Sequence, residues 1–107
     1  MNTVSWVLLI IAGLLEIVWA STMKSTEGFT KLWPSVFTVL GMIASFLLLA
    51  TAMKTIPAGT AYAVWTGIGA LGVVLVGIFW LGEPLTLWRS FFLAMILGGV
   101  VGLKMTG

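Results

Sequence analysis

The sequence has no cysteine, no histidine and no aspartate among its 107 residues. Without cysteine and histidine it lacks thiolate and imidazole metal ligands, a thiol nucleophile and the commonest general base. Its acids are Glu16, Glu27 and Glu83. Three glutamates offer few groups for catalysis, so we predict a protein that is not an enzyme, binds no metal and needs no cofactor.

Charge is scarce as well: charged residues make up 7% of the chain and hydrophobic residues 61%. An average soluble domain contains about 25% charged residues. A soluble fold of this size could not hide so much apolar surface. The five cations are scattered and leave a net charge of only +2, which does not support a nucleic-acid-binding surface. The composition therefore predicts an integral membrane protein.

Four apolar stretches are each about as long as a bilayer crossing, which takes roughly 20 residues. They cover residues 4–22, 33–53, 58–81 and 87–103. The connections between them are short, and Pro57 and Pro84 are typical of helix ends. Loops of this length place sequence neighbours antiparallel. We predict an all-α membrane protein that forms a single four-helix domain over residues 1–107.

The cations say little about orientation in the membrane. Lys24, Lys31 and Arg89 fall at one predicted membrane surface, whereas Lys54 and Lys104 fall at the other. Orientation follows an excess of Lys and Arg on one side, and three against two is a weak excess. Either the chain inserts in both orientations, or its orientation is fixed by features that a charge count does not contain.

Glu16 is the one acid inside a predicted span. A charged group at that depth costs at least ~2.5–3.5 kcal/mol, and such residues usually mark ion or substrate pathways. Apolar surroundings disfavour the carboxylate, whereas a bound cation favours it. Proton and cation would therefore compete for Glu16, and this competition is the minimal chemistry of an antiporter. The alternative is a protonated Glu16 that only joins helices.

Other polar and aromatic residues lie deep enough in the spans to accompany Glu16. Trp19 follows it by one helical turn, and Ser45 is the most central polar residue of the second span. Tyr62 and Trp65 share one face of the third span. We predict that these four residues form the substrate and proton site with Glu16. The alternatives are aromatic packing, and for Ser45 a hydrogen bond to its own helix.

Small residues indicate where helices bend and where they meet. Gly67 and Gly69 lie close together in the third span and form a candidate hinge, with close packing as the alternative. Ala94, Gly98 and Gly102 repeat every four residues in the fourth span, a spacing that favours helix association in lipid. One chain cannot easily enclose a pathway, so we predict a homodimer of eight helices associated through the fourth span.

Several motifs together resemble the small multidrug resistance (SMR) family. They are residues 12–20 (AGLLEIVWA), 28–35 (GFTKLWPS), Pro57 with 59–70 (GTAYAVWTGIGA), 82–85 (GEPL) and 102–104 (GLK). The resemblance covers essentially the whole chain. Gly13, Trp19 and residues 65–70 look most like the guanidinium exporter (Gdx) branch. Residues 21–23 (STM) are less typical of that branch and are similar to the multidrug branch.

The resemblance implies an antiparallel, dual-topology homodimer that exchanges protons for guanidinium across the bacterial inner membrane. It implies that Glu16 is the shared ligand, Ser45 and Trp19 support Glu16, Tyr62 is a gating hydrogen-bond partner and Trp65 is a wall. Planar guanidinium also pairs in a bidentate way with a carboxylate. Two alternatives stay open. One is a proton-coupled exporter of quaternary ammonium and other multidrug cations, which would rely on aromatic faces. The other is a non-transporting accessory membrane subunit.

Overall fold

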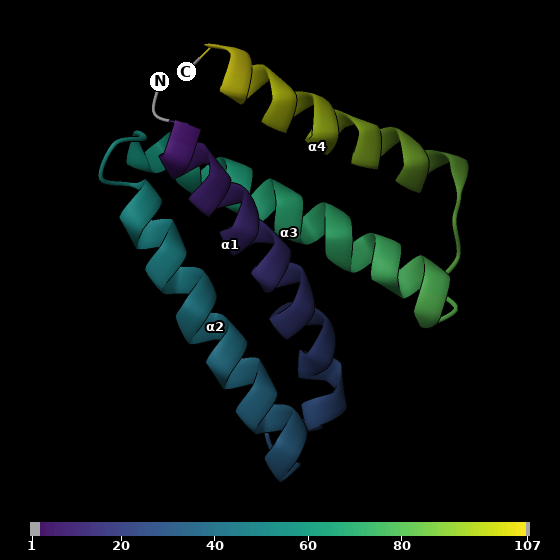
Figure 1. The fold of residues 1–107 in the computed structure, drawn as a ribbon. Helices are drawn as coiled ribbons and strands as arrows, with labels where there is room; N and C mark the ends of the chain where they lie inside the picture. Colours follow the sequence, from purple (N-terminus) through teal and green to yellow (C-terminus); the bar gives the residue numbers. More distant parts are fainter. Residues whose placement is uncertain (1–2, 107) are drawn as a thin grey trace.

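The computed structural model describes residues 3–106 as four long α-helices joined by short connections (Figure 1). Each long helix is long and apolar enough to cross a membrane. The helices are α1 (Thr3–Met23), α2 (Leu32–Ala52), α3 (Ala58–Trp80) and α4 (Leu87–Thr106), with a short 3-10 helix η1 (Lys24–Thr26) after α1. The predicted all-helical membrane fold is confirmed. The outer limits of the predicted domain, residues 1 and 107, lie outside the described residues.

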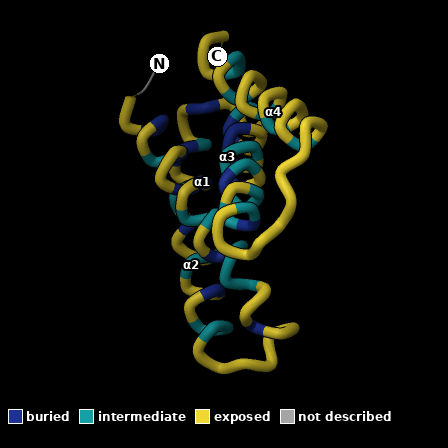
Figure 2. Tube along the Cα trace, turned by 90° about the vertical axis from the view of Figure 1, so that its right-hand side faces the viewer, coloured by how far each residue is buried: buried dark blue, intermediate teal, exposed yellow. Residues whose placement is uncertain are grey.

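The helices α1, α2 and α3 form the packed part of the molecule, with α1 in contact with both of the others (Figures 1 and 2). Their buried side chains make up the apolar core, which includes Leu9 and Ala12 of α1, Leu49 of α2 and Val64 of α3. By contrast, α4 packs along α3, touches α1 through Lys104 over the Trp6 ring, and has no buried residue in the described part of the chain. The surface that α4 leaves uncovered is apolar, so lipid or another helix must cover it.

The start of α1, the end of α4 and the α2–α3 connection lie together at one end of the bundle, which we call the terminal end (Figure 1). Lys54 and Lys104 belong to this end. The other two connections lie away from the terminal end and apart from each other, because the two helix pairs diverge: that of α1 and α2 is at the bottom and that of α3 and α4 at the right of Figure 1. We call this side the far end. There Trp33, Trp80 and Trp88 are exposed, as suits indoles at the depth of lipid headgroups. We therefore expect the two ends to lie at the two membrane surfaces.

At the far end, Arg89 fixes the connection between α3 and α4. Its guanidinium donates to the Pro84 carbonyl at 2.7 Å and to Glu83 Oε1 at 3.3 Å. The Glu83 amide donates to the Gly77 carbonyl at 3.0 Å, which turns the chain back at the end of α3. A Cβ on Gly77 would lie 2.6 Å from the Glu83 carboxyl carbon, so glycine lets this connection fold tightly. The pairing of α4 with α3 is thus held at its loop as well as along its length.

Candidate functional site

The carboxyl group of Glu16 lies between α1 and α3, packed against Gly69. A Cβ on Gly69 would overlap this carboxyl group, so the missing side chain is what makes room for it. Glu16 Oε1 is buried and has no hydrogen-bond partner within the described residues. A buried polar atom without a partner is costly in an apolar medium. The position can therefore accept a proton or a cation as the missing partner.

A hydrogen-bonded chain through Ser45 joins the three packed helices close to Glu16. The Ser45 hydroxyl on α2 donates to the Ala12 carbonyl of α1 at 2.7 Å and accepts from Trp65 Nε1 of α3 at 2.9 Å. Ser45 and Trp65 are both buried. Ala12 lies one turn before Glu16, so this chain fixes the segment of α1 that carries the acid. The hydroxyl bonds to a neighbouring helix, and the alternative of a bond back to its own helix is wrong.

Loss of the Ser45 hydroxyl should destabilise the protein. In Ser45→Ala, the Trp65 indole and the Ala12 carbonyl both lose a buried partner. Each such loss costs about 1–3 kcal/mol, so we expect a clear fall in the thermal unfolding midpoint in detergent. Thr51→Ala is the matched control, because the exposed Thr51 hydroxyl bonds only to the Leu47 carbonyl of its own helix. Equal midpoints for the two variants would contradict the joining role of Ser45.

An aromatic row crosses the three helices next to this chain. The ring centres of Trp19 and Phe46 are 5.9 Å apart, and those of Phe46 and Trp65 and of Trp65 and Tyr62 are each 5.6 Å apart. Trp19 and Trp65 are buried, whereas Phe46 is 44% and Tyr62 56% exposed. Sequence reasoning missed Phe46, because one phenylalanine in an apolar span carries no distinguishing signal. The row offers flat faces that can receive a cation.

Trp19 carries a second buried polar atom, its indole Nε1, that has no hydrogen-bond partner in the part of the chain that the structure describes. The ring is closely held, since a Cβ on Gly41 of α2 would lie 2.9 Å from Trp19 Cβ. The backbone carbonyl of Trp19 accepts a hydrogen bond from the Thr22 hydroxyl at 3.1 Å. The Thr22 and Thr38 hydroxyl oxygens are 2.7 Å apart. Sequence reasoning also missed this pair of threonines. The indole is thus fixed in place while its N–H remains available to a ligand or to a carboxylate.

The two candidate hinge glycines face different neighbours. Gly69 faces Glu16, whereas a Cβ on Gly67 would lie 2.5 Å from a methyl group of Val100 on α4. The helix α3 is continuous through both positions. Both glycines serve close packing in this structure, and bending at them stays a prediction.

The predicted dimer-packing residues lie on α4 and are not covered by the described part of the chain. Ala94 and Gly98 are exposed and Gly102 is half-buried. A Cβ on either glycine would meet nothing within 4 Å. This ladder of small residues is therefore open to a neighbouring helix.

Most of the chain matches the sequence model of a known protein family. A sequence model of the family described as Small Multidrug Resistance protein matches residues 4–96. The chain belongs to this family, and it is a multi-pass membrane protein of transporter class.

Its relatives include proteins named guanidinium exporter. That of Escherichia coli (strain K12) is 57% identical over 102 residues, which cover 95% of this chain and 97% of the relative. That of Yersinia pestis is 54% identical over 101 residues, covering 94% and 97%. That of Citrobacter freundii is 53% identical over 102 residues, covering 95% and 97%. The predicted family and its guanidinium exporter branch are confirmed.

Proposed function

We propose that this protein exports guanidinium and small substituted guanidinium cations in exchange for protons. The proposal rests on the Glu16 carboxyl group, which lies against Gly69 inside a membrane-capable helix and has a buried oxygen with no partner among residues 3–106. The names of the relatives supply the cation. An acid that only joined helices would be expected to have its buried oxygen bonded to another helix.

The shape and hydrogen-bonding capacity of guanidinium suit this site. Guanidinium is planar and offers paired N–H donors that match the two oxygens of one carboxylate. The unpartnered Trp19 N–H can donate to the same carboxylate and hold its plane. The neighbouring aromatic row, which ends at the half-exposed Tyr62, supplies faces for the flat cation. We propose that Tyr62 acts as the gating partner of Glu16 and Trp65 as a wall of the site.

Competition at Glu16 accounts for exchange. A proton and a cation cannot both neutralise one carboxylate, so binding of one favours release of the other. If the site opens to one side of the membrane at a time, each crossing of the protonated site in one direction is coupled to a crossing of the cation-bound site in the opposite direction. Crossing with an empty, charged carboxylate is disfavoured, because burying an unpaired charge in the membrane is costly. The proton gradient then drives export of the cation.

We propose further that the working unit is an antiparallel homodimer in the bacterial inner membrane. The open ladder of Ala94, Gly98 and Gly102 on α4 supports association between copies, because small residues let helix backbones approach closely in lipid. The weak difference in cation number between the two ends permits both orientations. Eight helices also provide the enclosure that one open chain lacks.

A bulky side chain on the ladder should separate the copies. In Gly98→Leu we expect the particle mass in detergent, measured by light scattering, to fall from that of two chains to that of one. Gly59→Leu is the control, since a Cβ at Gly59 also meets nothing within 4 Å but lies on α3. Retention of the two-chain mass by Gly98→Leu would place the interface elsewhere.

Transport measurements in liposomes separate the candidate functions. We expect purified protein reconstituted in liposomes to give currents evoked by guanidinium on a solid-supported membrane, and none evoked by tetraethylammonium. Currents with tetraethylammonium alone would instead identify an exporter of quaternary ammonium cations. The absence of currents with both cations would refute transport and favour an accessory subunit.

A further inference from the structure

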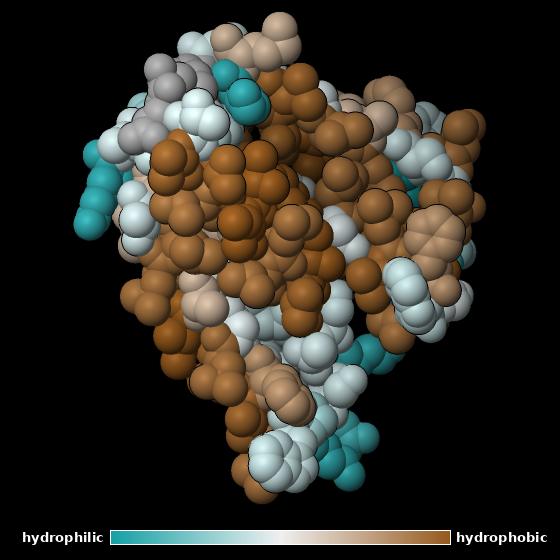
Figure 3. Space-filling view, in the orientation of Figure 1, coloured by the Kyte–Doolittle hydropathy of each residue, from teal (hydrophilic) through white to brown (hydrophobic). Residues whose placement is uncertain are grey.

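A groove with apolar walls runs between α1, α3 and α4 at the terminal end of the bundle. Its volume is about 390 Å³. Val64 and Ile68 of α3 line it, with Ile10 on the α1 side and Val101 on the α4 side. In Figure 1, α3 lies behind the space between α1 and α4, and the same view in Figure 3 shows a mainly apolar surface there. The groove opens outward, where lipid surrounds a membrane protein.

Lys104 lies at the mouth of this groove and is the one charged residue in its lining. Its ammonium nitrogen is 5.4 Å from the centre of the buried Trp6 ring, a distance at which the ring face attracts a cation. A second hollow of about 260 Å³, lined by Thr3 and Val7 among others, lies next to the first. The two hollows share Trp6, Ile10 and Lys104. One cation therefore stands between two apolar hollows.

No carboxylate neutralises Lys104 among the described residues. The two ion pairs among the described residues are Lys31 with Glu27 and Arg89 with Glu83, and both lie at the far end. The remaining acid, Glu16, is mid-span on α1. A lone ammonium at the membrane surface above two apolar hollows is complementary to an amphiphile with an anionic head and two acyl chains. We propose that the α1–α3–α4 groove binds an anionic phospholipid, with its phosphate at Lys104 and its acyl chains in the two hollows.

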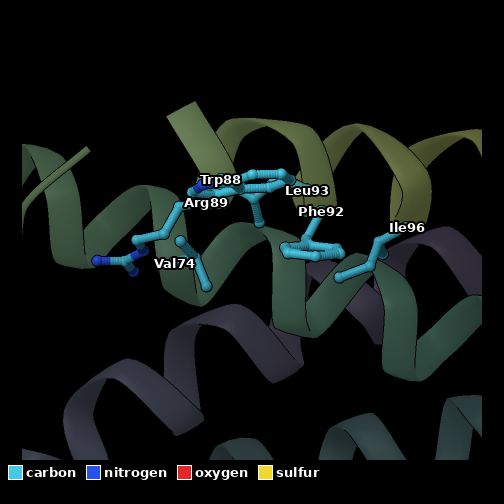
Figure 4. A pocket seen from close by; sticks show the side chains of 6 residues that line it. All are labelled: Val74, Trp88, Arg89, Phe92, Leu93 and Ile96. Carbon is cyan, nitrogen blue, oxygen red and sulfur yellow. The ribbon is translucent and has the colours of Figure 1, made fainter. Parts of the chain in front are cut away.

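A third apolar hollow at the opposite end of α4 shows why the proposal is specific to Lys104. Val74, Trp88, Arg89, Phe92 and Ile96 line this hollow of about 250 Å³ (Figure 4). Here the cation is already bound, because Arg89 donates to Glu83 and to the Pro84 carbonyl. Its guanidinium extends away from Phe92 and Ile96 (Figure 4). This hollow has apolar walls but offers no free positive charge.

A second copy of the chain is the other candidate occupant of the groove, and the geometry of α4 disfavours it. Val100 and Lys104 each follow a ladder glycine, Gly98 and Gly102, by two residues. Two residues correspond to a rotation of about 200° around a helix with 3.6 residues per turn. Val100 and Lys104 therefore face away from the ladder, whereas Val101 and Met105, which also line the groove, lie within about 60° of Gly98. A copy that packs on the ladder can cover the outer edge of the groove but leaves Lys104 and the wall beside Val100 to lipid.

Native mass spectrometry of the detergent-purified protein tests this site, because one spectrum reports both bound lipids and the number of chains. We expect the wild type to retain phosphatidylglycerol in preference to phosphatidylcholine. In Lys104→Gln, retention of phosphatidylglycerol should fall about fivefold, the effect of one lysine near an anionic headgroup, while retention of phosphatidylcholine should not change. Lys54→Gln is the matched control, since Lys54 is exposed at the same end but lines neither hollow. Equal losses in the two variants, or no loss in Lys104→Gln, would overturn the proposal.

The apolar part of the site has its own test. Ile10→Trp fills the groove from α1, away from the ladder, while leaving Lys104 in place. We expect this variant to lose retained phosphatidylglycerol with an unchanged number of chains per particle. A drop in the number of chains would assign the groove to a second copy and overturn the proposal, and so would full retention of the lipid.

Discussion

Replacing Glu16 with glutamine should reduce proton-driven uptake of guanidinium into liposomes to the level of protein-free liposomes. Glutamine has nearly the same size as glutamate, so its side chain still fills the space beside Gly69. It carries no charge at any working pH, so it can neither pair with a cation nor exchange a proton for one. Glu16→Gln therefore removes both proton binding and cation pairing at this position. Uptake of radiolabelled guanidinium under an imposed pH difference measures the effect, and circular dichroism checks the helix content.

Glu27→Gln is the matched control for this experiment. Glu27 is an exposed acid outside the long helices, and its 3.7 Å contact with Lys31 is an exposed ion pair. Pairs of that kind contribute little to stability, so uptake by Glu27→Gln should equal that of the wild type. Normal pH-driven uptake by Glu16→Gln would refute the role assigned to Glu16.

The second large effect is expected at Gly69. The added methyl group of Gly69→Ala would occupy the position of the Glu16 carboxyl group, so either the acid must move or α1 and α3 must separate. Overpacking of this kind costs typically about 1–3 kcal/mol. A misplacement of a reacting group by ~1 Å can lower a rate on the order of 100-fold. We therefore expect guanidinium exchange to fall by roughly that factor, with a lower unfolding midpoint.

Gly59→Ala provides the comparison within the same helix. A Cβ at Gly59 would meet nothing within 4 Å, and alanine favours a helix over glycine by up to about 1 kcal/mol. This variant should therefore keep its exchange activity and unfold no earlier than the wild type. If Gly69→Ala exchanged guanidinium as fast as Gly59→Ala, the functional position of the Glu16 carboxyl group would have to lie elsewhere.

The helices could be predicted from the sequence because apolar runs and prolines are local signals. The predicted span at residues 4–22 became Thr3–Met23, and the fourth helix begins at Leu87 as predicted. That helix continues beyond its predicted end to Thr106, because a lysine at position 104 can remain helical while its charge reaches the membrane surface. The depth of Glu16, Trp19 and Trp65 in their helices followed from the same local pattern.

The contacts between helices could not be predicted in the same way. Spacing along one helix shows which residues share a face, but not which residue of the next helix meets that face. Gly69 was therefore expected as a hinge or as a close-packing residue, and the sequence did not show that its missing side chain makes room for Glu16. The partner of the Ser45 hydroxyl proved to be the carbonyl of Ala12, a backbone atom that no residue-type pattern marks. Such facts depend on the packing of α1, α2 and α3 as a set.

The isolated position of α4 bears on the order in which the protein is assembled during synthesis. Glu16, Ser45 and Trp65 all belong to α1, α2 and α3, which leave the ribosome before α4 does. The contacts among these three helices do not involve α4, which packs on α3 and places the Lys104 side chain over the Trp6 ring of α1. The contacts that hold Glu16, Ser45 and Trp65 can thus form in the membrane while the last helix is still being translated. In the proposed homodimer, the surface that recruits a second copy would be completed only when α4 arrives.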